Sequence, residues 1–374
     1  IDAAHLFLVA HDDERSRFRY HRLVRQVLRV ELRARDRARE QALQLRAAEW
    51  FEAAGDIRRA AYHYLAAQQP DQALALLQDR VVSDFLQSPT APEPLVLGMV
   101  DPSPLVETPE RLLGLAAELL LSGDTARGGE YLDLLEHAGT IPAESKLAAR
   151  FAAFQSFRYG VVGQLEKSVR AARAAQAIQE RMQFTDEWNA AVPLILMRVY
   201  SCLDDFAAVE REAAAALAAP EVSEPARLVM VPGSLALAQF ESGRLAEAAD
   251  TARAADADAR RLGFSQHFFA TDILRTLAGL ALERRDLDTA ERFARIAARI
   301  RNANHWPFAL LVSFLAIRQR SAETVRAADV LLQRYPGYNV ATARSDFFFC
   351  GDSDLVERFL NGLRHAGLPE TAAS

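Results

Sequence analysis

Aromatic and basic residues recur in this sequence about 16 to 19 residues ahead of a repeated break in helical sequence. Their rings can stack on the apolar face of a pyranose, and the polar side chains beside them can hydrogen-bond its hydroxyls. This combination predicts the binding of a small molecule, and a di- or oligosaccharide fits it. The candidate ligand-binding residues are Trp188, Asn189, Arg198, Arg227, Gln239, Gln266, His267, Phe268, Asp272, His305 and Trp306.

A packing role explains the same residues without a ligand. Large aromatic side chains such as Trp188 and Trp306 often fill the gap between neighbouring repeats at the start of a helix. The polar residues further along these helices, among them Arg198, Gln239 and Asp272, also fit the ordinary amphipathic pattern of a helix. The residue types alone leave both interpretations open.

Motifs of catalysis and metal binding are missing from the sequence. It contains no G-x-S-x-G, H-E-x-x-H, C-x-x-C or G-x-G-x-x-G segment. The acidic pair Asp204-Asp205 lies in a turn, where a carboxylate caps a helix. His5 and His11 would supply two metal ligands without a third. The sequence therefore predicts a protein that is not an enzyme and holds neither metal nor cofactor.

The elements that must position the candidate residues are helices in a repeating array. Alanine-rich stretches alternate with short Gly-Asp breaks, and the residues after successive breaks are about 40 positions apart: Thr125, Leu165, Phe206, Leu245 and Leu287. Such a period is typical of stacked helix pairs that share one continuous core. We predict an all-α fold, a right-handed superhelix of tetratricopeptide-like helix pairs. The first helix of each pair would line its concave groove.

The ends of the chain depart from this pattern. An apolar run at residues 6–9 and the alternating segment at residues 17–20 predict a β-hairpin, and helical periodicity begins at His21. Prolines concentrate near residues 89–108 and oppose helix there. The predicted domains are residues 1–45, a helical connector at 46–88, a Pro-rich linker at 89–108 and the superhelix at 109–374.

The amino-acid composition limits the kinds of partner that the chain can be expected to bind. The chain has 374 residues, half of them hydrophobic, a formal net charge of −6 and a pI near 5.8. An acidic balance argues against a dedicated nucleic-acid surface. The two cysteines have no metal-ligand spacing and suit a reducing cytoplasm. No apolar run reaches the roughly 18 residues of a membrane span. We therefore expect a cytoplasmic protein.

Three segments resemble motifs of MalT-like regulators, which are LuxR-type, ATP-dependent transcriptional activators of the STAND class. They are residues 6–14, FRYHRLVRQVL at residues 18–28 and AAEWFEAAGD at residues 47–56. The resemblance implies a fragment that holds the end of a winged-helix region, residues 1–45, followed by the sensor superhelix. It also implies that His21 contacts the nucleotide in the parent protein.

The resemblance also assigns partners. ATP or ADP would bind elsewhere in the parent protein, because this chain has no G-x-x-x-x-G-K-[ST] loop. DNA would be bound only through a C-terminal module absent here. The chain itself would sense a small-molecule inducer, possibly a sugar, in its concave groove and contact other domains of the parent. The alternative is a protein-binding scaffold whose groove recruits a regulatory partner.

Overall fold

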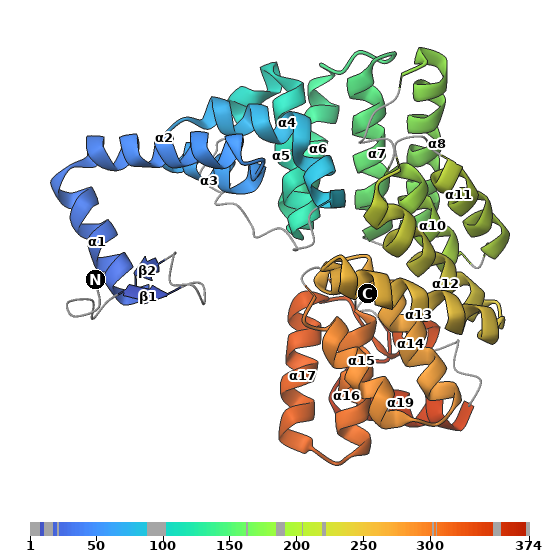
Figure 1. Cartoon of the computed structure of the whole chain (residues 1–374). Helices are drawn as coiled ribbons and strands as arrows, with labels where there is room; N and C mark the ends of the chain where they lie inside the picture. The colour runs from blue at the N-terminus through green and yellow to red at the C-terminus, as the bar shows by residue number, and fades with distance from the viewer. Residues whose placement is uncertain are drawn as a thin grey trace. The chain divides into compact units, whose positions relative to one another are not determined.

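The computed structural model shows a chain built almost entirely of helices (Figure 1). The described residues are 8–10, 18–20, 22–87, 102–161, 164–184, 191–203, 205–218, 222–300, 303, 305–346 and 353–371. They form two compact units, which divide inside a long helix: residues up to Asp79 belong to the first and residues from Arg80 onward to the second. The predicted Pro-rich linker lies mostly in residues 88–101, outside the described residues.

The first unit contains a β-hairpin and helices. Its elements are β1 (Leu8–Ala10), β2 (Phe18–Tyr20), α1 (Arg22–Arg35), α2 (Arg37–Ala53), α3 (Ile57–Ala66) and the start of α4 (Pro70–Gln87). β1 pairs antiparallel with β2, with Val9 opposite Arg19. On α1 the apolar side chains of Leu23, Val27 and Val30 are exposed. The expected helical stripe is therefore present, but no described element covers it.

Six successive helix pairs make up most of the second unit, and Figure 1 shows them following one another from α5 to α17. The pairs are α5 (Pro109–Ser122) with α6 (Thr125–Ala138), α7 (Lys146–Val161) with α8 (Leu165–Met182), α10 (Val192–Cys202) with α11 (Phe206–Ala218), α12 (Val231–Glu241) with α13 (Leu245–Arg261), α14 (Ala270–Glu283) with α15 (Leu287–Ala297), and α16 (Trp306–Ile317) with α17 (Ser321–Arg334).

Short helices accompany these pairs. They are the 3-10 helices η2 (Ser103–Glu107) and η4 (Phe264–Gln266), the π-helix η3 (Ala226–Met230), and the terminal α18 (Val340–Asp346) and α19 (Ser353–His365). Helix α19 packs on α16 and α18. Its Phe359 meets Phe314 of α16 edge to face at 5.4 Å between ring centroids, and both side chains are fully buried. These contacts close the C-terminal end of the core.

The recurring break has a local cause. At Gly123 the backbone enters the left-handed region with φ 94°, which ends α5, and Asp124 then accepts a hydrogen bond from Arg127 N at 3.2 Å and caps α6. Asp286 caps α15 in the same way through Thr289 N at 3.1 Å. Asp205, from the acidic pair expected to cap a helix, accepts from Ala208 N at 3.0 Å. At the breaks capped by Asp124, Asp205 and Asp286, a local hydrogen bond therefore fixes where the next helix begins.

The first helices of successive pairs pack against one another, since α12 contacts both α10 and α14. Small residues permit the approach. A Cβ at Gly279 of α14 would come within 2.4 Å of the Phe240 ring on α12. The predicted all-α fold of stacked helix pairs is confirmed, and beyond residue 45 the described part of the chain contains no strand.

Candidate ligand-binding site

A polar cluster joins the first helices of three successive pairs. Arg198 lies on α10, Ser234 on α12 and Asp272 on α14. Because α12 lies between the other two helices in the stack and contacts both, the three side chains reach one point although they are far apart in sequence. We call Arg198, Ser234, Phe268 and Asp272 the polar cluster.

The carboxylate of Asp272 is the centre of this cluster. Arg198 Nη1 donates to its Oδ1 at 2.7 Å, and Ser234 Oγ donates to its Oδ2 at 3.0 Å. Asp272 is only 3% exposed, so its charge depends on these two donors rather than on water. Both oxygens are therefore held in fixed positions.

Arg198 is more exposed to solvent than Asp272. Its guanidinium lies over the ring of Phe268, 4.6 Å from the centroid, and its side chain keeps 23% of its surface exposed. A guanidinium carries five N–H donors. Within the described residues one of them is engaged, by Asp272. The polar cluster thus presents a positioned cation with free donors beside a partly buried aromatic ring.

A second polar group lies on the same helices. Gln239 of α12 is buried, and its Oε1 has no hydrogen-bond partner in the described part of the chain. A buried acceptor without a partner costs about 1–3 kcal/mol, which a ligand donor would recover. Gln239 belongs to the predicted candidates, but its Oε1 is closed off from the surface, so a hydroxyl could reach it only if the surrounding packing opened.

His267 has a structural partner from a distant segment. Its Nε2 lies 2.9 Å from the backbone oxygen of Phe85, at the end of α4, and this geometry has the ring nitrogen donate to the carbonyl. The imidazole is fully buried, with its ring 4.9 Å from that of Phe85 and 5.1 Å from that of Phe264. Burial lowers the pKa of His267 to about 4, so the ring is neutral at neutral pH. His267 therefore holds the second half of α4 against the array.

The other described candidates do not join the polar cluster. Trp306 is 2% exposed within the C-terminal core, which favours the packing role that the sequence left open. His305 packs its ring against Tyr335 and Tyr338. Arg227, in η3, and Gln266, in η4, are exposed.

Three sequence candidates lie outside the described residues: His21, Trp188 and Asn189. Sequence reasoning identified Arg198, Phe268 and Asp272, which meet, but it missed Ser234. A serine within an apolar helix carries no signal of its own. Its position 38 residues before Asp272, close to one repeat, is the pattern that would have pointed to it.

Two general features of the described residues bear on function. Their His, Cys, Asp and Glu side chains nowhere gather in a group of three or more that could hold a metal ion. Every described helix is too short or too polar to cross a bilayer.

The comparison with known families concerns the N-terminal part of the chain. Residues 1–40 match the model of the MalT winged helix domain, and this range holds the hairpin, α1 and the start of α2. No curated protein matches the chain. The match supports a likeness to MalT-like regulators of transcription. It does not reach the helical array, which begins after residue 100.

Proposed function

We propose that the helical array senses a small polyhydroxylated molecule, a di- or oligosaccharide, on behalf of a transcription regulator similar to MalT. The winged-helix match supports the regulator, and the polar cluster carries the proposal of a ligand. The chain would work in the cytoplasm as a binding module and catalyse no reaction. It would need no metal or cofactor.

The observation that carries the sugar site is the partly exposed Arg198 beside Phe268. A fixed guanidinium offers several directed N–H donors for hydroxyl oxygens, and the adjacent ring offers an apolar surface. Asp272 and Ser234 keep the guanidinium in place, so little side-chain freedom would be lost on binding. The buried Oε1 of Gln239 would accept from a hydroxyl that reaches it.

Ligand binding would also connect three repeats. Because the polar cluster includes Arg198 from α10, Ser234 from α12 and Asp272 from α14, a molecule bound to it would favour one arrangement of these helices. A sensor needs such a coupling between occupancy and the relative position of its parts. The array can supply it without any moving loop.

A thermal-shift titration tests the proposal. Di- and oligosaccharides built from several different monosaccharides are titrated against the chain, and a ligand at a hundredfold excess over its Kd stabilises the folded state by about 2.7 kcal/mol. We expect a rise of a few degrees in Tm. Arg198→Gln should abolish this rise. The matched control is Arg181→Gln, which removes an exposed arginine of α8 that pairs with Glu144 at 3.0 Å.

The outcome separates sensor from scaffold. A sugar response that survives in Arg198→Gln would place the ligand elsewhere. If no sugar in the panel raises Tm, the array does not sense a sugar, and the protein-binding scaffold becomes the better interpretation. Because the comparison uses the ligand-induced change within each variant, a lower starting Tm in Arg198→Gln does not affect it.

A further inference from the structure

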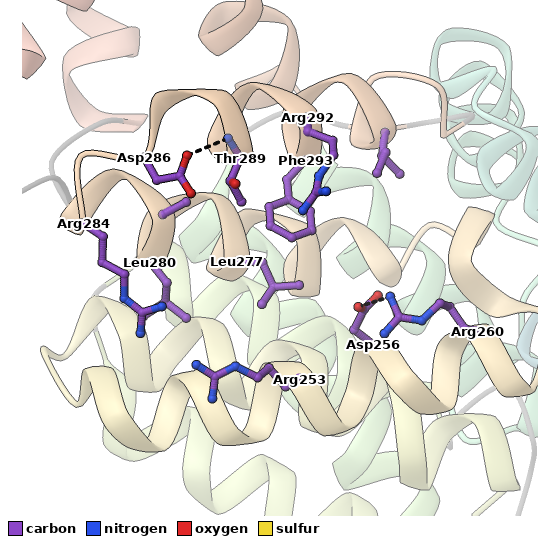
Figure 2. Close-up of a pocket in the computed structure, with 12 residues that line it drawn as sticks. Arg253, Asp256, Arg260, Leu277, Leu280, Arg284, Asp286, Thr289, Arg292 and Phe293 are labelled. Atoms are coloured by element: carbon purple, nitrogen blue, oxygen red, sulfur yellow. Dashed lines mark hydrogen bonds and ion pairs between the residues drawn. The ribbon is translucent and has the colours of Figure 1, made fainter.

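A cavity of about 530 Å³ lies between α13, α14 and α15, away from the polar cluster. Figure 2 shows the side chains of Arg253, Arg284 and Arg292 around Leu277 and Phe293. Its volume falls within the range of small-molecule sites in proteins. We call it the arginine pocket.

Positive charge dominates the lining. Four arginines against two aspartates leave a formal charge of +2, on a protein whose net charge is −6. Of the two aspartates, Asp256 pairs with Arg260 at 2.5 Å. Asp286 caps α15 through Thr289, and this hydrogen bonding is the main reason why the pKa of its carboxyl is lowered. Asp256 is thus paired within the lining, and Asp286 forms no ion pair with a described arginine.

Two of these arginines have no ion-pair partner within the described part of the chain. Arg284 ends α14 and is exposed, and Arg292 lies over the ring of Phe293 with its guanidinium carbon 5.3 Å from the centroid. Arg292 is near enough to Asp286 to contribute to the lower pKa of that carboxyl, but the pair is not within ion-pair distance. Among the described residues Arg253 pairs with Asp250, whose side chain is 85% exposed.

Apolar side chains complete the pocket. Leu277 and Leu280 come from α14, and Phe293 and Ile296 from α15. A guanidinium binds carboxylates and phosphates through paired N–H donors. The apolar side chains beside it stabilise a complex only when an apolar part of the ligand covers them. The arrangement therefore suits a ligand with an anionic head and an apolar body.

We propose that the arginine pocket binds a small amphipathic anion, a phosphate or carboxylate joined to a ring or short aliphatic chain. The anionic group would bind Arg284 or Arg292, which Figure 2 shows at opposite sides of the pocket, and the apolar body would cover Leu277 and Phe293. This site is separate from the proposed sugar site, with which it shares the helix α14 but no residue. The array would then bind two kinds of ligand, a neutral sugar at the polar cluster and an amphipathic anion at the arginine pocket.

Calorimetric titration of the whole chain tests this proposal with three defined probes at low salt. Phenyl phosphate carries both features, inorganic phosphate only the charge, and benzyl alcohol only the ring. Phenyl phosphate should bind more tightly than the other two. The double variant Arg284→Gln, Arg292→Gln should raise its Kd at least tenfold, which corresponds to about 1.4 kcal/mol, because it removes the charged donors proposed to bind the anionic group.

Arg326→Gln is the matched control, since it removes an exposed arginine of α17 outside the pocket. Its Kd for phenyl phosphate should equal that of the wild type. Circular dichroism checks that all variants fold. We expect that they do, because these arginines are exposed. The proposal is overturned if the double variant binds phenyl phosphate like the wild type or if the control weakens binding equally. Equal affinity for inorganic phosphate would also overturn it.

Discussion

The polar cluster and the arginine pocket use the two halves of one helix in opposite ways. Near the start of α14, Asp272 is buried and each of its oxygens has a donor. Near its end, Arg284 is exposed with no carboxylate paired to it among the described residues. Both regions contain arginine, yet one has its charge balanced inside the protein and the other does not.

Burial explains the difference. A charge removed from water needs partners at fixed positions, because the low dielectric of the interior makes an unpaired charge expensive. A charge at the surface is solvated and can stay unpaired at little cost, so it remains available to a ligand. Substitutions in the polar cluster should therefore change stability strongly. Substitutions in the arginine pocket should change binding and leave stability nearly constant.

The largest effect is expected for Asp272→Ala. It leaves Arg198 and Ser234 without their shared acceptor, and removing one partner of a buried pair costs about 3–5 kcal/mol. Because Arg198 is partly exposed, we expect a loss at the lower end, about 3 kcal/mol. Chemical denaturation at neutral pH measures it. The control Asp250→Ala removes an exposed carboxylate of α13 and should change stability by about 0.5 kcal/mol or less. Equal losses of stability in Asp272→Ala and Asp250→Ala would contradict the expected difference between buried and exposed charges.

His267 should make stability depend on pH. Its pKa is lowered from 6.5 to about 4, so between these values the unfolded state takes up a proton that the folded state does not. This contribution is fully present above pH 6.5 and is lost as pH falls toward 4. The loss between pH 7.5 and 4.5 should be about 2.5 kcal/mol. His267→Gln removes it, so the difference between wild type and variant should shrink on acidification. A constant difference across this range would refute the assignment.

A smaller effect is expected for Gly279→Ala, which disturbs the helix that both regions share. The new methyl would meet the ring of Phe240 at 2.4 Å, and overpacking of this kind costs about 1–3 kcal/mol. Alanine regains up to about 1 kcal/mol of helix propensity, so the net loss should be about 1 kcal/mol. Thermal denaturation measures it. Gly337→Ala, with open space around its added methyl, is the control and should be nearly neutral.

The smallest effect is expected for the arginine pocket. Without ligand, Arg284→Gln combined with Arg292→Gln should change the free energy of unfolding by less than about 0.5 kcal/mol, because both side chains are exposed. Chemical denaturation of the ligand-free protein measures this. A loss as large as that of Asp272→Ala would mean that the pocket arginines support the fold, and the contrast between the two regions would fail.

Sequence reasoning succeeded where the cause is local. The breaks at Gly123-Asp124 and at Arg285-Asp286 end one helix and cap the next through residues a few positions apart, so their recurrence predicted the helix pairs. It also identified Arg198, Phe268 and Asp272 as polar or aromatic exceptions on apolar helices. It had no means to distinguish the partly exposed Arg198 from the buried Trp306, because both lie on apolar first helices of a pair.

The sequence by itself determined the helices, their pairing and the period of the array, since helix ends and caps depend on neighbouring residues. Only the tertiary structure decided which side chains meet. Ser234 reaches Asp272 because α12 packs on α14, and the carbonyl of Phe85 reaches His267 across 182 residues. The arginine pocket likewise exists only because α13, α14 and α15 lie together. Contacts of this range depend on how the repeats stack, and no single repeat encodes that arrangement.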